Sequence, residues 1–295
     1  MSRQNHPFYD KHDDRLKALW TMDRSNKNRE EKLAKLKEAV SKCSPNGLIN
    51  MYDDKTGEAR AKVTTLIIAC FEGDYDTIQY LIDSGANPNE CESEHNLTAI
   101  HILVDGPYKG QTITETERAQ LIRTLVKKGA DVNHVDKLQL APIHKVAIND
   151  RPQCLDALIE ANADPNVVFM GERAVSIAAR QNRDNILKKL LEYPKTKIDV
   201  KNDNGGTILH FAAAAMVDTP ECIDLLIKAG LDVNSKDQRG NSPAMVACFF
   251  NKPRILKSLV SANADLTIKN NEGKDAAALC DEREAEECKA IIQKK

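Results

Sequence analysis

The sequence predicts an all-α repeat solenoid in which pairs of short helices are joined by β-hairpin turns, and two recurring phrases predict it. The first phrase, of the type Gly-Ala-Asp-Val-Asn, occurs six times, and its last residue falls at positions 89, 133, 166, 201, 234 and 267. Four of the five steps are 33 or 35 residues long, and one is 44. Such a period is typical of repeat architectures, whose units stack because no unit can bury its apolar face alone.

The second phrase keeps the same period and marks the first helix of each unit. It reads Thr-Ala-Ile-His from Thr98, Ala-Pro-Ile-His from Ala141, Thr-Ile-Leu-His from Thr207 and Ser-Pro-Ala-Met from Ser242. Thr or Ser at its start can cap a helix, and Pro in second place suits the first helical turn. A short helix is therefore expected to begin at each copy.

The second helix of each unit shows apolar residues at helical spacing, as Leu121, Ile122 and Leu125 do in one unit. It should end where the first phrase begins, because that position holds a residue that tolerates a left-handed turn. The residues at this position are Gly85, Gly129, Asn162, Gly230 and Asn263. The phrase then leads into an exposed turn, which completes a unit of helix, helix and hairpin.

Together the two phrases resemble the ankyrin-repeat family, whose unit is about 33 residues long and carries a Thr-Pro-Leu-His signature. The resemblance implies an ankyrin-repeat stack of six repeats, at residues 64–97, 98–140, 141–172, 173–206, 207–241 and 242–273. We expect a degenerate N-terminal capping repeat at 29–63 and a C-terminal capping repeat at 274–295, since terminal units need polar outer faces. Residues 1–28 are expected to be a partly disordered N-terminal extension.

The 44-residue step indicates about eleven extra residues between the two helices of the second repeat, within residues 105–117. This stretch contains Gly and Pro and is expected to be a surface loop. It either adds a contact for a partner or is tolerated variation in length, because a longer loop costs little free energy.

The composition excludes several classes of protein. The chain has 42 Lys and Arg against 44 Asp and Glu, a net charge of −2, which argues against a nucleic-acid partner. No apolar stretch is long enough to span a membrane, so we expect no membrane insertion. The N-terminus lacks a signal peptide, and none of the eight cysteines forms a Cys-x-x-Cys pair. We expect a protein of the cytoplasm, or of the cytoplasm and nucleus, that is monomeric on its own.

No residue pattern of an enzyme is present. The sequence has no His-Glu-x-x-His metal motif, P-loop, dinucleotide fingerprint or nucleophile elbow. His101, His144 and His210 occupy the same slot in different repeats, where the family uses His to tie a loop to its neighbour. Cys91 and His95 share one hairpin, but two ligands do not make a zinc site. We expect no catalytic residue, metal or cofactor, and therefore no enzyme.

The resemblance implies a non-catalytic protein–protein interaction module. In this family, the hairpin tips and the exposed face of each first helix form a concave surface that binds a protein. The repeat register places these residues there, and we expect them to contact a partner: Leu138, Ile148, Phe169, Met170, Arg180, Gln181, Arg239, Phe249 and Phe250. We expect an adaptor, scaffold or inhibitor. The alternative is a substrate-selecting subunit of an enzyme complex such as a ubiquitin ligase or a phosphatase.

Apolar residues stand out at two of these positions. The tip after Asn166 reads Val-Val-Phe-Met-Gly, whereas most tips are polar, and Phe249 and Phe250 are adjacent at displayed positions. Aromatic and Met side chains are enriched in the cores of protein interfaces, so we expect both places to contact a partner. The alternative for Phe249 and Phe250 is that one ring turns inward to fill space.

Two asparagines resemble the pattern that the asparaginyl hydroxylase of the hypoxia pathway accepts in ankyrin repeats. Asn133 and Asn234 each follow an Asp by two residues and a Leu by eight. If the source is an animal, we expect partial hydroxylation at both. The alternative is that these residues only order the hairpin.

Overall fold

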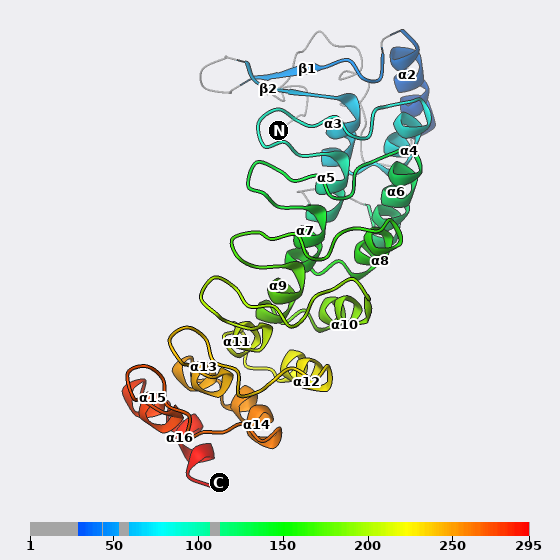
Figure 1. The fold of residues 1–295 in the computed structure, drawn as a ribbon. Helices are drawn as coiled ribbons and strands as arrows, with labels where there is room; N and C mark the ends of the chain where they lie inside the picture. The colour runs from blue at the N-terminus through cyan, green and yellow to red at the C-terminus, as the bar shows by residue number, and fades with distance from the viewer. Residues whose placement is uncertain (1–28, 43, 53–58, 107–112, 295) are drawn as a thin grey trace. The chain divides into compact units, whose positions relative to one another are not determined.

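The computed structural model describes residues 29–42, 44–52, 59–106 and 113–294 (Figure 1). The expected N-terminal extension, at 1–28, and the centre of the expected insertion, at 107–112, lie outside the described residues. The described chain is helical, apart from one two-stranded sheet near its beginning. The all-α class with hairpin turns is therefore confirmed.

The helices form pairs, each with a short first helix and a second helix. The first helices are α3 (Thr65–Glu72), α5 (Ala99–Asp105), α7 (Pro142–Asn149), α9 (Ala174–Arg180), α11 (Ile208–Ala213), α13 (Pro243–Phe249) and α15 (Ala276–Glu282). The second helices are α4 (Tyr75–Asp83), α6 (Glu115–Lys127), α8 (Pro152–Glu160), α10 (Asp184–Glu192), α12 (Glu221–Lys228), α14 (Pro253–Ser261) and α16 (Glu286–Ile292). Ahead of them lie α2 (Arg29–Lys42), β1 (Ile49–Tyr52) and β2 (Ala59–Val63).

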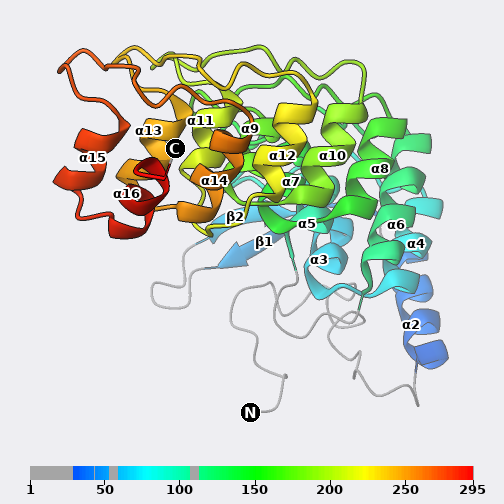
Figure 2. The same ribbon diagram turned by 90° about the horizontal axis from the view of Figure 1, so that it is seen from below.

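The pairs belong to two compact units, which are described separately. Unit 1 comprises residues 1–145 and 153–163, and unit 2 comprises 146–152 and 164–295. In unit 1, α3 packs on α5 and α4 packs on α6. In unit 2, the first helices α9, α11, α13 and α15 stack in order, and the second helices α10, α12, α14 and α16 stack beside them (Figure 1, Figure 2). Within each unit the chain is therefore a stack of repeats.

Helix α2 and strands β1 and β2 of unit 1 occupy the region where an N-terminal capping repeat is expected. Helix α2 buries Leu36, Ala39 and Val40, while the charged residues between them are exposed. Strands β1 and β2 pair antiparallel, with Ile49 opposite Val63, and both of these side chains are buried. One apolar face and one polar face are what a terminal unit needs.

Five second helices, α4, α6, α8, α12 and α14, are followed by a left-handed residue at the predicted position, whereas the C-cap of α10, Tyr193, has a φ of −79°. Gly129 has a φ of 89°, and Asn162 takes the same kind of conformation with a φ of 60°. Asparagine tolerates this region better than most residues with a side chain, so it can replace glycine there. The predicted helix ends are confirmed.

The last Asn of the first phrase joins one repeat to the next. The Asn89 side-chain amide donates to the Gly129 carbonyl oxygen at 2.9 Å, and its oxygen accepts from the Asp131 backbone N–H at 2.8 Å. Asn166 makes the same pair of bonds to Lys195 and Lys197, at 2.8 and 2.9 Å. The bridge spans 40 residues from Asn89 and 29 from Asn166, so it joins neighbouring hairpins across repeats of different length.

The expected loop at 105–117 is shorter than predicted, because α6 begins at Glu115. Helix α6 has 13 residues and α4 has 9, so part of the extra length extends the second helix. Thr114 and Glu117 form a capping box, in which each side chain bonds the backbone N–H of the other. One turn later, the buried Arg118 donates to the Leu103 carbonyl oxygen at 2.8 Å and so ties α6 to α5.

Candidate functional site

Most residues predicted to contact a partner are at least partly exposed on hairpins and first helices. Leu138, in unit 1, exposes 67% of its surface, and Met170, in unit 2, exposes 86%. Phe249 and Phe250 expose 37% and 50%, so neither ring turns fully inward. Arg239 is exposed at the tip of its hairpin.

Phe169 differs from the prediction, because it is half-buried rather than displayed. Its backbone pairs with that of Glu172 in both directions, at 2.8 and 2.9 Å, and this closes the tip into a tight turn. Met170 lies at the apex of that turn with a positive φ of 50°. The tip therefore displays Met170 rather than Phe169.

The remaining predicted residues of unit 2 are half-buried and partly engaged within the protein. Ile148, Arg180 and Gln181 are all of intermediate exposure. The Arg180 guanidinium forms an ion pair with Glu172 at 3.2 Å. Gln181 follows the last residue of α9, and its backbone N–H donates to the Ile177 carbonyl oxygen. Only part of each of these side chains is therefore accessible to a partner.

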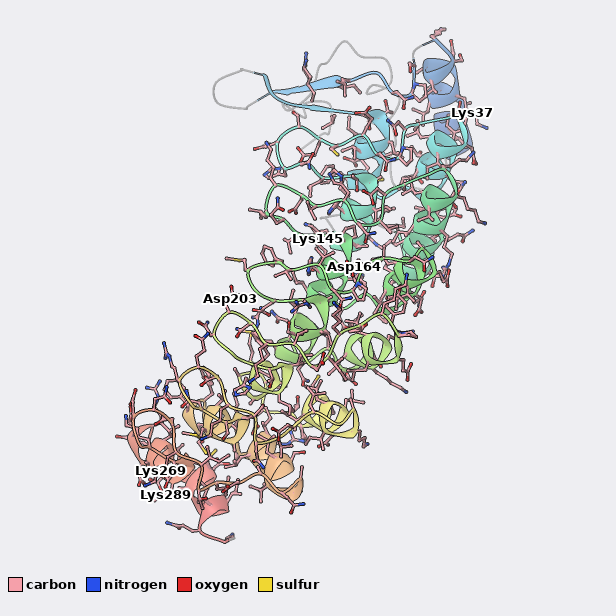
Figure 3. The ribbon with its side chains drawn as sticks, viewed as in Figure 1. Lys37, Lys145, Asp164, Asp203, Lys269 and Lys289 are labelled. Atoms are coloured by element: carbon pink, nitrogen blue, oxygen red, sulfur yellow. The ribbon has the colours of Figure 1, made fainter. Side chains whose placement is uncertain are left out.

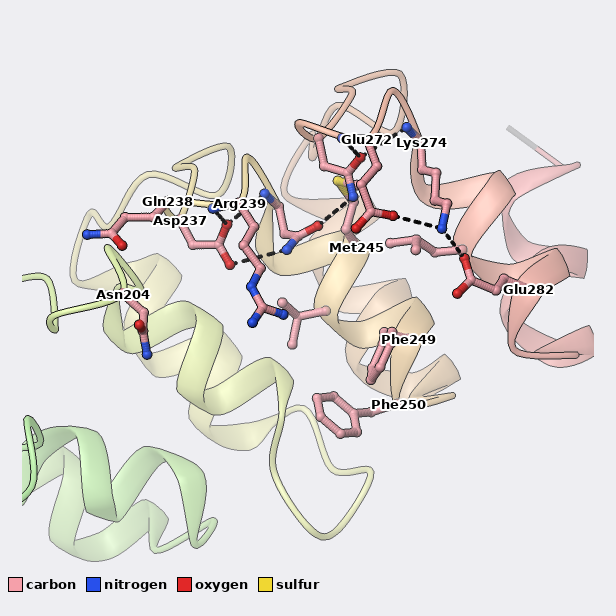
Figure 4. Close-up of a pocket in the computed structure, with 14 residues that line it drawn as sticks. Asn204, Asp237, Gln238, Arg239, Met245, Phe249, Phe250, Glu272, Lys274 and Glu282 are labelled. Atoms are coloured by element: carbon pink, nitrogen blue, oxygen red, sulfur yellow. Dashed lines mark hydrogen bonds and ion pairs between the residues drawn. The ribbon is translucent and has the colours of Figure 1, made fainter.

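A cavity of about 450 Å³ lies in unit 2, between hairpin tips and first helices (Figure 4). Its lining comprises Asn204, Asp237, Gln238, Arg239, Asn241, Met245, Val246, Phe249, Phe250, Asn270, Glu272, Lys274, Leu279 and Glu282. We call it the Phe249–Phe250 cavity. Of the predicted contact residues, it brings together Arg239, Phe249 and Phe250, and it does not include Phe169, Met170, Ile148, Arg180 or Gln181.

The apolar part of the cavity comes mainly from helix α13. Met245 is buried beneath it, and Phe249 and Phe250 close the last turn of the helix. The two rings meet edge to face, with centroids 5.1 Å apart and planes at 79°. Aromatic pairs favour this geometry, so the pair is a preformed apolar surface.

The charged rim of the cavity is held by contacts within the protein. Lys274 forms ion pairs with Glu272 at 2.8 Å and with Glu282 at 2.6 Å. These two carboxylates raise the pKa of Lys274, and Lys274 lowers the pKa of Glu272, because each partner favours the charged form of the other. The Asp237 carboxylate accepts from the backbone N–H groups of Arg239 and Asn241, which fixes the hairpin.

Sequence reasoning missed the contribution of the last repeat, which it treated only as a cap. Lys274, Leu279 and Glu282 line the cavity, and Arg283 covers one face of the Phe249 ring. The repeat period could have predicted that Glu282 and Arg283 lie beside the aromatic pair, because they follow Phe249 and Phe250 by 33 residues. Residues at equivalent positions of neighbouring repeats lie side by side in a stack.

The histidines of the second phrase bridge their own helix start to the next hairpin. The Nδ1 atom of His101 accepts from the Thr98 backbone N–H at 3.3 Å, and its Nε2 lies 3.1 Å from the Leu140 carbonyl oxygen. His210 repeats both contacts with Thr207 and Asn241. Because Nδ1 accepts, Nε2 must carry the proton, and both ring nitrogens are occupied as in a structural histidine.

Two groupings in unit 1 have the residue types of metal ligands. The Glu92 carboxylate lies near Glu94 and His95, but it already accepts the backbone N–H groups of Glu94 and His95 at 2.8 and 2.5 Å. The Cys91 thiol lies 3.4 Å from Nε2 of His134 in the next hairpin, not beside His95 as their shared hairpin suggested. Burial and neighbouring carboxylates raise the pKa of Cys91, which disfavours the thiolate that metals and electrophiles require.

The two predicted hydroxylation sites differ in their surroundings. Asn133 is exposed, and its backbone N–H donates to Asp131 at 2.8 Å. Asn234 is half-buried, and its side-chain oxygen accepts from the Asp265 backbone N–H of the next repeat at 2.8 Å. Asn234 therefore has an ordering role in the stack, and hydroxylation of either residue stays a prediction.

Comparisons with known proteins find the same repeat. Family models described as ankyrin repeats (3 copies) match residues 113–202 and 175–270, and one described as ankyrin repeats (many copies) matches 66–111. The ankyrin repeat domain of human ASB11 has a similar fold, with a TM-score of 0.63 and 20% identity over 76% of this chain and 96% of that chain.

Curated relatives share the repeat but are much longer proteins. Alpha-latrocrustotoxin-Lt1a of Latrodectus tredecimguttatus is 29% identical over 58% of this chain, and the E3 ubiquitin-protein ligase KEG of Arabidopsis thaliana is 28% identical over 50%. The human transient receptor potential cation channel subfamily A member 1 is 25% identical over 72%. The matched region spans only 12%, 9% and 25% of these relatives.

In the part of the chain that the structure describes, every helix is too short or too polar to cross a membrane. The repeated helix pairs, the Asn bridges between them and the match of the family models to more than half of the sequence agree with one another. The chain belongs to the ankyrin-repeat family, whose repeats are protein–protein interaction modules.

Proposed function

We propose that this chain is an adaptor or inhibitor that holds one protein partner at the Phe249–Phe250 cavity. The single observation that supports the proposal is the pair of aromatic rings exposed beside that cavity, at 37% and 50%. Exposed aromatic side chains in a concave, partly apolar place are typical of protein-binding surfaces, where a few anchors carry most of the affinity.

Its setting is proposed on composition alone. A net charge of −2 is in keeping with a cytoplasmic, and also nuclear, protein that is monomeric without its partner. No sequence pattern or close grouping of side chains in the described part supports catalysis, and ankyrin repeats are typically non-catalytic.

The second candidate function is selection of substrates for an enzyme complex. It is favoured by the similarity to a ubiquitin ligase, but that similarity covers only 9% of the ligase. A toxin and a cation channel show comparable similarity, so the similarity reflects the shared repeat and does not indicate one activity. We therefore place the adaptor or inhibitor first.

A pull-down from cells of the source organism tests the proposal. The tagged full chain is compared with a Phe249→Ser, Phe250→Ser double variant, and captured proteins are identified by mass spectrometry. Met216→Ser is the matched control, because Met216 exposes 77% of its surface outside the cavity. One dominant protein that only the double variant fails to capture supports the proposal. A set of ligase or phosphatase components supports the second candidate. Equal capture by all three chains would show that the cavity is not the partner-binding site.

A further inference from the structure

The acidic side chains around the Phe249–Phe250 cavity have partners within the protein, whereas one basic side chain has none in the part of the chain that the structure describes. Its carboxylates already have cationic or N–H partners: Lys274 holds Glu272 and Glu282, and two backbone N–H groups hold Asp237. A carboxylate that is paired in this way attracts a further cation only weakly. The cavity is therefore a poor site for a basic segment of a partner.

Arg239 is the cation that the cavity leaves available. Its backbone is fixed on both sides, because its N–H donates to Asp237 and its carbonyl oxygen accepts from Asn271, each at 2.9 Å. Within the described residues, its guanidinium forms no hydrogen bond or ion pair. The positive charge of Arg239 does contribute, through space, to the lowered pKa of Glu272. Figure 4 shows the side chain directed from the hairpin into the cavity, toward α13.

A second guanidinium, that of Arg283, contacts the aromatic pair. The Arg283 guanidinium lies over the Phe249 ring, 3.6 Å from its centroid. Two arginines therefore lie by the apolar surface of Phe249 and Phe250: Arg239 from a hairpin tip lines the cavity, and Arg283 from the C-cap of α15 lies over the Phe249 ring. This is the charge pattern that complements an acidic segment with an apolar anchor.

We propose that the cavity binds a linear segment of a partner protein in which a large apolar side chain stands next to an Asp or Glu. The apolar side chain packs on Phe249 and Phe250, and the carboxylate forms a bidentate ion pair with Arg239. A volume of about 450 Å³ suits one or two side chains of such a segment. This inference rests on the proposed function and names the chemistry of the partner.

A displayed library of random 16-residue peptides provides the probe. The full chain is the bait, and peptides that also bind the Phe249→Ser, Phe250→Ser double variant are removed. We expect enriched peptides to carry a large apolar residue within three positions of Asp or Glu. Enrichment of Lys- or Arg-rich peptides, or of no peptide at all, would overturn the inference.

The affinity of a labelled, end-blocked consensus peptide then tests Arg239 directly. Arg239→Glu should raise Kd at least tenfold, and Arg239→Lys should raise it less, because a lysine keeps the charge but loses the bidentate geometry. Arg254→Glu is the matched control: it makes the same charge change at an exposed residue outside the cavity and should change Kd less than twofold. Exchanging the peptide's Asp for Asn should add little to the loss caused by Arg239→Glu.

The outcomes separate this inference from the proposed function. If Phe249→Ser abolishes peptide binding while Arg239→Glu and Arg254→Glu have equal effects, the cavity binds protein but the acidic preference is wrong. If the cavity is filled instead by a second copy of this chain, light scattering will show a dimer that Phe249→Ser dissociates, and the inference is also wrong. Unchanged melting temperatures of the arginine variants show that the fold is intact.

Discussion

The guanidinium of Arg283 lies over the ring of Phe249, with its central carbon 3.6 Å from the ring centroid. Phe249 ends α13 and Arg283 follows α15, so the contact joins two neighbouring repeats at the edge of the cavity. It also covers one face of an exposed aromatic ring. The same contact therefore stabilises the last repeat and presents a cation beside the proposed binding surface.

Arg283→Ala should lower the free energy of unfolding of the full chain by about 0.5–1 kcal/mol, the usual contribution of an exposed cation–π contact. Urea unfolding followed by circular dichroism measures the change. Arg254→Ala removes the same side chain from an exposed position that has no ring contact among the described residues, and it should change stability less. Equal effects of the two substitutions would contradict a stabilising role for the Arg283 contact.

Lys145→Met should destabilise the protein by about 3 kcal/mol. Lys145, labelled on α7 in Figure 3, has a side chain only 11% exposed and pairs with Asp105 at 3.1 Å and Asp136 at 3.6 Å. Its loss leaves the buried Asp136 carboxylate without this cation, which is the costly way to break a buried ion pair.

Lys42→Met is the control for Lys145→Met. Lys42 also pairs with a carboxylate, that of Glu38, but both side chains are about two-thirds exposed, at 67% and 66%. Exposed ion pairs contribute little to stability, because water and salt screen the two charges. The chemical denaturation midpoint should therefore fall far more for Lys145→Met than for Lys42→Met, and similar shifts would show that the buried cluster is unimportant for stability.

Stability should fall as the pH is lowered from about 6.5 toward 4, in part because of His101. Burial lowers the pKa of His101 to about 4, below its ordinary value of 6.5. Between these values the unfolded chain binds a proton that the folded chain does not, so acid favours unfolding there. The urea midpoint should drop less between pH 7 and pH 5 in His101→Asn than in the unmodified protein. Identical drops would contradict a neutral, buried His101.

Hydroxylation should occur at Asn133 and Asn234 when the chain is made in animal cells with active asparaginyl hydroxylase. The exposed Asn133 should be modified to a greater extent than the half-buried Asn234, because the hydroxylase must reach the side chain. Intact mass and peptide mapping would find additions of one oxygen. Unmodified asparagine at both positions would leave them with an ordering role alone.

The parts of the fold that follow local rules could be predicted from the sequence. Helix ends at Gly129 and Asn162 depend on one residue's backbone preference, and both lie where the sequence placed them. The exposure of Phe249 and Phe250 followed from the register of the repeat in the same way. A regular period carries this information because equivalent positions have equivalent surroundings.

Contacts between repeats could not be predicted in the same way. Phe169 was expected to be displayed, but its backbone pairs with Glu172 around Met170 and Gly171, both with positive φ, and Gly171 is the one residue of the tip that signals such a turn. Arg283 contacts Phe249, 34 positions away, and one of the two partners of Lys145, Asp105, lies 40 positions away. Only the packing of one repeat on another brings such groups together.

The affinity of the captured partner for two alanine variants tests the central claim, that the exposed face of unit 2 recognises a protein. Phe249→Ala and Phe169→Ala should each weaken binding by more than about 1 kcal/mol, the scale of an interface hot spot, with a melting temperature close to that of the unmodified chain. The expected loss is larger for Phe249, because Phe169 is half-buried and reaches a partner only in part. Unchanged affinities for both variants, with the melting temperature preserved, would contradict the claim and place the binding face elsewhere on the chain.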